Sequence, residues 1–141
     1  MIRMRLLPAA VLALAAASAT SGETPSTPGT ELYFIGLEDG ATLQNPVTLH
    51  FGLKGMGIAP AGVEMEGTGH HHLLINATVE GEMFDNPLPA DDNHIHFGGG
   101  QTETTRELPP GTHTIQLILG DHNHIPHDPP VMSERIQITV E

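Results

Sequence analysis

Glycine and proline interrupt this chain so often that long helices are excluded. The 141 residues include 16 glycines and 12 prolines, which lie in clusters with short apolar runs between them. A proline inside a helix removes a hydrogen bond and clashes with the preceding turn, and a glycine there costs backbone entropy. No window keeps a helical period of apolar residues over several turns. The pattern therefore favours short strands joined by tight turns.

The apolar runs between these clusters alternate as strands do. Residues 47–53 place Val47, Leu49 and Phe51 on one face, and residues 112–119 repeat the pattern. A period of two is that of a half-buried strand. The sequence predicts seven strands, at 32–37, 47–53, 71–79, 94–97, 102–108, 112–119 and 132–140. Seven short strands in one domain indicate an all-β fold, a single antiparallel immunoglobulin-like β-sandwich over residues 31–141.

The first 19 residues have the layout of a secretory signal peptide. Arg3 and Arg5 form a basic start, an apolar run covers residues 6–17, and an Ala-Ser-Ala cleavage site precedes the next threonine. The run is too short to span a bilayer as a helix. We expect residues 1–19 to be removed and residues 20–30, rich in Ser, Thr, Pro and Gly, to form a disordered leader. The mature protein is then periplasmic or secreted, with no stable membrane insertion.

The charge of the chain limits its partners. Seventeen acidic residues face only five basic ones, which gives a formal net charge of −12 with neutral histidines. An acidic surface repels polyanions, so nucleic acid and anionic lipid are not expected as partners. The chain has no cysteine, which excludes disulfides and thiolate metal ligands. A metal ion is the expected partner, with another protein of the cell envelope as a further candidate.

Histidine is the residue type that points to chemistry. There are ten histidines, and three pairs of them have His-x-His spacing. On a strand, residues i and i+2 share a face, so two imidazoles at this spacing can reach one ion. Neutral imidazole suits zinc and copper. The candidate metal ligands are His70, His72, His94, His96, His122, His124 and His127.

The expected topology brings these histidines together. In a Greek-key sandwich, the start of the 71–79 strand, the turn after 94–97 and the loop after 112–119 lie at one end. The set exceeds one tetrahedral site, so either two ions bind or some imidazoles only support the others. His113 follows a different pattern, because it alternates with core residues, and we expect it to be buried and bonded to backbone. We expect His50 to face solvent.

Three stretches carry a resemblance to a known family: GTGHHHLLIN at 67–76, NHIHFGGGQTE at 93–103 and GDHNHIPHDPP at 120–130. With these motifs the chain resembles a family of small exported bacterial proteins catalogued as domain of unknown function 4399. The resemblance covers about residues 47–140. It implies one fold unit and an envelope location, and it assigns no activity.

A looser resemblance is to the periplasmic copper-resistance β-sandwich proteins. It rests on the opening at 38–51 and the stretch at 108–115. It implies a sandwich fold with a copper site. Those proteins use a histidine at the mature N-terminus as a ligand, and this chain has none there, so the likeness is stronger for the fold than for the site.

Three functions fit these observations. The favoured one is an exported, histidine-rich carrier, buffer or sensor that binds copper or zinc. The second is a metal-dependent enzyme, in which a three-His site with an open position activates water and Glu103 or Asp121 acts as base. The third is a metal-free interaction module whose histidines become charged below about pH 6.5. No Ser or Cys nucleophile constellation stands out, so a non-catalytic role is preferred.

Overall fold

The structure is a computed structural model, and it describes residues 23–141. The expected signal peptide lies outside the described residues. The strands are β1 (Glu31–Phe34), β2 (Thr42–Leu43), β3 (Val47–Lys54), β4 (Gly57–Ile58), β5 (Thr68–Ile75), β6 (His94–His96), β7 (Glu103–Arg106), β8 (Gly111–Gly120) and β9 (Ile136–Val140). A single 3-10 turn, η1 (Gly81–Asp85), interrupts the loop between β5 and β6. Within this described part, no helix has the length and apolar character needed to cross a membrane.

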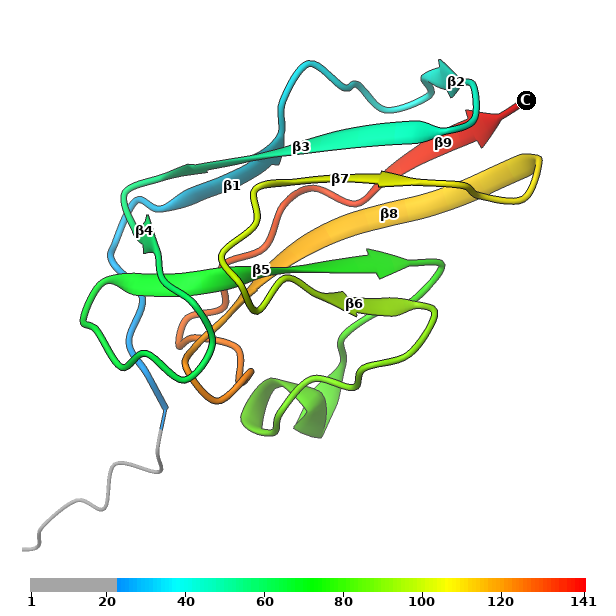
Figure 1. Ribbon diagram of the computed structural model, residues 1–141. Helices are drawn as coiled ribbons and strands as arrows, with labels where there is room; N and C mark the ends of the chain where they lie inside the picture. The colour runs from blue at the N-terminus through cyan, green and yellow to red at the C-terminus, as the bar shows by residue number, and fades with distance from the viewer. Residues whose placement is uncertain (1–22) are drawn as a thin grey trace, which may run out of the picture.

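The strands form two sheets (Figure 1). The smaller sheet has the order β1-β3-β7, and the larger has the order β2-β9-β8-β5-β4 with β6 also paired to β5. The pairings are antiparallel except for two short parallel pairs, β2 with β9 and β4 with β5. The predicted all-β sandwich is confirmed, and each of the seven predicted strands has a counterpart in the structure. The two-residue strands β2 and β4 are too short to leave a periodic signal in the sequence.

The third predicted strand has the wrong boundaries. It was expected at 71–79, but β5 begins at Thr68 and ends at Ile75. The preceding glycines look like turn residues in the sequence. Gly69, however, lies inside the strand, where a Cβ would sit 2.7 Å from the carbonyl oxygen of Gly120 on β8. The histidine triplet, residues 70–72, therefore lies inside a paired strand and not at the start of one.

Both faces of β5 are buried from Gly69 onward, and every residue from there to Ile75 is glycine, histidine or aliphatic. On the inner face, Leu73 packs between the sheets with Phe51 and Leu117. On the outer face, Leu74 and Ile118 form a second cluster with residues from the segment 76–93. This covering segment includes η1 and lies on the side of the larger sheet away from β1 and β3 (Figure 1). It keeps water from the face to which alternate residues of β5 point.

The two histidines predicted to lie outside the main group behave as expected. His113 is buried, its Nε2 lies 2.7 Å from the carbonyl oxygen of Pro109, and its Nδ1 lies 2.9 Å from the side-chain amide of Asn76. His50 is exposed, and its ring lies 3.2 Å from the carboxylate of Glu103. Alternation along β3 and β8 accounts for both positions.

Residues 23–30 are held against the loop that follows β8. The backbone N–H of Asp128 donates to the carbonyl oxygen of Thr24 at 2.9 Å, and the N–H of Ser26 donates back to Asp128 at 3.0 Å. The Ser26 hydroxyl also donates to the carbonyl oxygen of Pro129 at 2.7 Å. These contacts run against the expected disordered leader for residues 23–30, because pairing with a distant segment leaves no trace in local composition. Residues 20–22 lie outside the described part of the chain.

His71 is a fully buried polar residue in the inner core. Its ring centroid lies 5.1 Å from that of Phe51, and neither ring nitrogen has a hydrogen-bond partner in the structure. Burial lowers the pKa of His71 from its ordinary value of 6.5 to about 4. The ring is therefore neutral at neutral pH, and its single N–H is unsatisfied in the apolar interior.

We predict that His71→Leu stabilises the protein. Removing an unsatisfied buried donor should raise the free energy of unfolding at neutral pH by about 1–3 kcal/mol. The pH dependence should also weaken. Without the substitution, His71 takes up a proton near pH 6.5 in the unfolded state but only near pH 4 in the folded state. Lowering the pH through this range therefore reduces the free energy of unfolding by on the order of 3 kcal/mol. Urea unfolding at neutral pH and at about pH 5 measures both effects, and a variant that is less stable with an unchanged pH profile would contradict them.

Candidate metal centre

Alternation along β5 sends His70 and His72 to the covered outer face of the larger sheet. Their Nε2 atoms lie 2.8 Å apart. A third imidazole comes from the loop after β8, where Nδ1 of His124 lies 3.0 Å from Nε2 of His70. Each pair of these three nitrogens is within 4.8 Å. One strand and one loop thus bring three ring nitrogens to one point.

Protons alone satisfy these nitrogens poorly. A neutral ring nitrogen offers either one proton or one lone pair, and never both. Nε2 of His70 contacts nitrogens of both His72 and His124. If it carries a proton, it can donate to only one of them, and if it carries a lone pair, that pair must accept from both. A cation between three lone pairs would satisfy all three nitrogens together.

Burial keeps these imidazoles neutral. It lowers the pKa of His70 to about 4, with further lowering from the neighbouring His124. It lowers the pKa of His72 to about 2, helped next by the charge that His70 would carry. The pKa of His124 is also lowered, first by burial. The lone pairs are therefore free to bind a metal at neutral pH.

Gly120 makes the space that these rings occupy. It lies opposite His70 in the β5–β8 ladder. A Cβ at this position would lie 2.5 Å from Nε2 of His72 and 3.4 Å from Cα of His124. Any larger residue would push into the point where the nitrogens meet. This role could not be recognised from the sequence, in which the glycine looks like the end of a strand.

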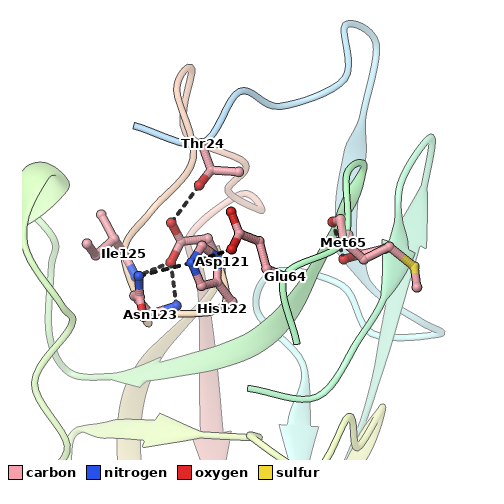
Figure 2. A network of polar contacts seen from close by, with 8 residues as sticks. Thr24, Glu64, Met65, Asp121, His122, Asn123 and Ile125 are labelled. Carbon is pink, nitrogen blue, oxygen red and sulfur yellow. Dashed lines mark hydrogen bonds and ion pairs between the residues drawn. The ribbon is translucent and has the colours of Figure 1, made fainter. Parts of the chain in front are cut away.

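Asp121 shapes the loop that carries His124. Its side chain is buried, and one carboxylate oxygen accepts from the backbone N–H groups of Asn123 at 2.8 Å and Ile125 at 3.0 Å. The other oxygen accepts from the Thr24 hydroxyl at 2.7 Å (Figure 2). The turn that results holds His124 in the left-handed region, with φ of 64°. Asp121, one of the two candidate bases, is thus fully engaged in holding the loop.

His96 borders the three converging histidines. It lies opposite His72 in the β5–β6 ladder. Its ring centroid lies 4.2 Å from that of His72 and 4.6 Å from that of His124. Its nitrogens are outside the group of three that meet within 4.8 Å.

The other three predicted ligands lie apart from this group. His94 pairs with Leu74 along the ladder, and its Nδ1 lies 2.7 Å from the carboxylate of Asp91. His122 sits on the same loop as His124 but lies 3.9 Å from Glu64 and 3.0 Å from the amide of Asn123 (Figure 2). His127 is buried with Nε2 3.1 Å from the carbonyl oxygen of Thr68. The His-x-His spacing drew attention to the part of the chain in which three histidines meet, but it did not show which of the seven come together.

Comparison with known proteins identifies the family. The family described as a domain of unknown function, DUF4399, has a model that matches residues 49–141. The chain belongs to the DUF4399 family. The DUF4399 match contains all seven predicted ligands and names no ligand or activity. No curated protein and no solved structure matches the chain. The resemblance to copper-resistance proteins stays an expectation.

We predict that Asp121→Ala loosens the loop, whereas Asp121→Asn is milder. Alanine leaves the N–H groups of Asn123 and Ile125 without their carboxylate acceptor, and each hydrogen bond to a charged group contributes about 1.5–3 kcal/mol. Asparagine keeps one oxygen for them. Urea unfolding should therefore show a loss of about 3 kcal/mol for alanine and about 1 kcal/mol for asparagine. The ring NMR signals of His124 should shift most in the alanine variant. Equal stability of the alanine variant and the native protein would rule out this role.

Proposed function

We propose that this DUF4399 protein binds one copper or zinc ion between His70, His72 and His124. The observation that carries the proposal is the meeting of three neutral imidazole nitrogens within 4.8 Å at a buried point. Two nitrogens bound to one tetrahedral ion at 2.0–2.1 Å lie about 3.3 Å apart. The observed separations of 2.8 and 3.0 Å need only a small expansion to admit the ion.

The role that fits best is an exported carrier, buffer or sensor of the metal. His124 is only partly buried, so the site can exchange its ion with the surroundings. The signal-like sequence at 1–19 supports a periplasmic or secreted location. A carrier in the envelope would hand its ion to another protein, which makes a second envelope protein a candidate partner.

The structure offers less support to the enzyme. Both oxygens of Asp121 accept hydrogen bonds within the loop, so this carboxylate is not free to act as a base. The alternative base, Glu103, lies on β7 of the smaller sheet and contacts His50. Neither carboxylate is placed to activate a water on the three nitrogens.

The metal-free pH switch is also weaker than metal binding. Such a module needs histidines that gain charge near pH 6. Burial instead lowers the pKa values of His70 and His71 to about 4 and that of His72 to about 2. The histidine triplet therefore stays neutral through the range in which the switch would act.

Calorimetric titration of residues 20–141 with Zn(II), Cu(II) and Cu(I) at neutral pH tests the proposal. We expect one ion per chain with a dissociation constant below about 1 µM, equivalent to about 8 kcal/mol of binding free energy. His70→Ala, His72→Ala and His124→Ala should each weaken binding strongly, because each removes a ligand. The exposed His50→Ala is the matched control and should bind as the native chain does. Weak binding without a defined stoichiometry would overturn the proposal.

Substitution of two glycines gives a second test in which no histidine is replaced. Gly120→Ala should block binding, because its Cβ would lie 2.5 Å from Nε2 of His72 and displace the ring. Gly57→Ala on β4 is the control, since its Cβ would meet only Thr68 at an ordinary 3.6 Å. Both variants are titrated as above after circular dichroism has checked their fold. Native-like affinity in Gly120→Ala would place the ion elsewhere.

A further inference from the structure

A fourth imidazole, that of His96, packs against the rings at the proposed ion position. Ring centroids within the set of His70, His72, His96 and His124 are 4.2 to 5.5 Å apart for five of the six pairs. Imidazoles bound to one tetrahedral ion through bonds of 2.0–2.1 Å have centroids about 5 Å apart. His96 is therefore spaced like a member of the group, although its nitrogens lie outside the three that already meet.

The tautomer of His96 is set by the backbone. Its Nε2 lies 2.6 Å from the carbonyl oxygen of Pro89. A carbonyl oxygen only accepts, so Nε2 must carry the proton. In the neutral ring the lone pair is then on Nδ1. This is the arrangement of a metal-binding histidine, in which one nitrogen donates to a backbone carbonyl and the other is free for the ion.

The short segment at Leu88 and Pro89 is hydrogen-bonded to both His96 and His124. The carbonyl of Pro89 accepts from His96, and the neighbouring N–H of Leu88 donates to the carbonyl oxygen of His124 at 2.9 Å. From the other side, the pairing of His96 with His72 across β5 and β6 fixes the spacing of their backbones. The covering segment thus holds His96 and His124 beside the two rigid ligands on β5.

We propose that His96 is the fourth ligand, bound through Nδ1, and that the site is a closed four-imidazole centre for a divalent ion. The inference rests on the proposed function and deepens it. The ring turns toward the ion as it binds and keeps its hydrogen bond to Pro89. Four nitrogens without sulfur favour Zn(II) or Cu(II) over Cu(I), since soft sulfur ligands select Cu(I). A filled coordination shell leaves no position for water, as in sites that hold a metal rather than use it in catalysis.

Cobalt spectroscopy tests this inference, with Co(II) as a probe of the zinc geometry. Residues 20–141 loaded with Co(II) should give a tetrahedral visible spectrum that azide does not change. His96→Gly should bind at least 10-fold more weakly, since even supporting residues contribute 10- to 100-fold to metal affinity. Its spectrum should change with azide, and added imidazole should restore the native spectrum by filling the vacated position. His96→Gln serves as a second variant if the glycine weakens β6.

His94→Gly is the matched control, because His94 lies two residues away on the same strand and pairs with Asp91 instead. It should keep the native affinity and the native response to azide. If His96→Gly and His96→Gln both match the native chain in affinity and spectrum, His96 is not a ligand, and the three-histidine site stands alone. An azide-sensitive native spectrum overturns the closed site in the same way. If the native chain binds none of Co(II), Zn(II), Cu(II) and Cu(I), the proposed function itself fails.

Discussion

The close pairing of β5 with β8 is the constraint on which the site depends. At Gly69 and Gly120 the two backbones and the histidine rings leave no room for a Cβ. This close approach leaves the space in which the rings of His70 and His72 meet that of His124 edge to face. Because β5 is paired with β8 from His70 to Ile75, the ladder fixes the backbone positions of both histidines on β5. The rigidity comes from the ladder, and the adjustable part of the site comes from the loops.

Much of the fold follows from local sequence, and much of the site does not. The period of two in stretches such as 112–119 is enough to predict the sandwich, because each strand carries its own pattern of burial. The gathering of histidines at one end also follows from strand order. The choice among them depends on ladder register, which pairs His96 with His72 but His94 with Leu74. No local signal contains this register. None distinguishes a turn glycine from Gly120, which leaves room for the ring of His72.

A site of this kind carries a cost in stability. Nδ1 of His70 and of His72 is buried without a partner, and so are both nitrogens of His71. Unsatisfied buried polar atoms normally destabilise a fold by about 1–3 kcal/mol each. A metal that binds only the folded chain would offset this cost by mass action. Binding at Nε2 of His70 and His72 would offset the cost of burying these two rings, whereas His71 lies on the inner face against Phe51 and would gain nothing from it.

The hydrogen bond from Thr24 to Asp121 couples two regions that are far apart in the sequence. Asp121 joins the start of the described chain to the loop that carries His124, so these two regions are thermodynamically linked. Whatever orders the loop also orders residues 23–30, and by reciprocity a change that pulls Thr24 away from Asp121 loosens the loop. A purification tag fused just before Thr24 would strain this link, whereas one at the C-terminus would be remote from it.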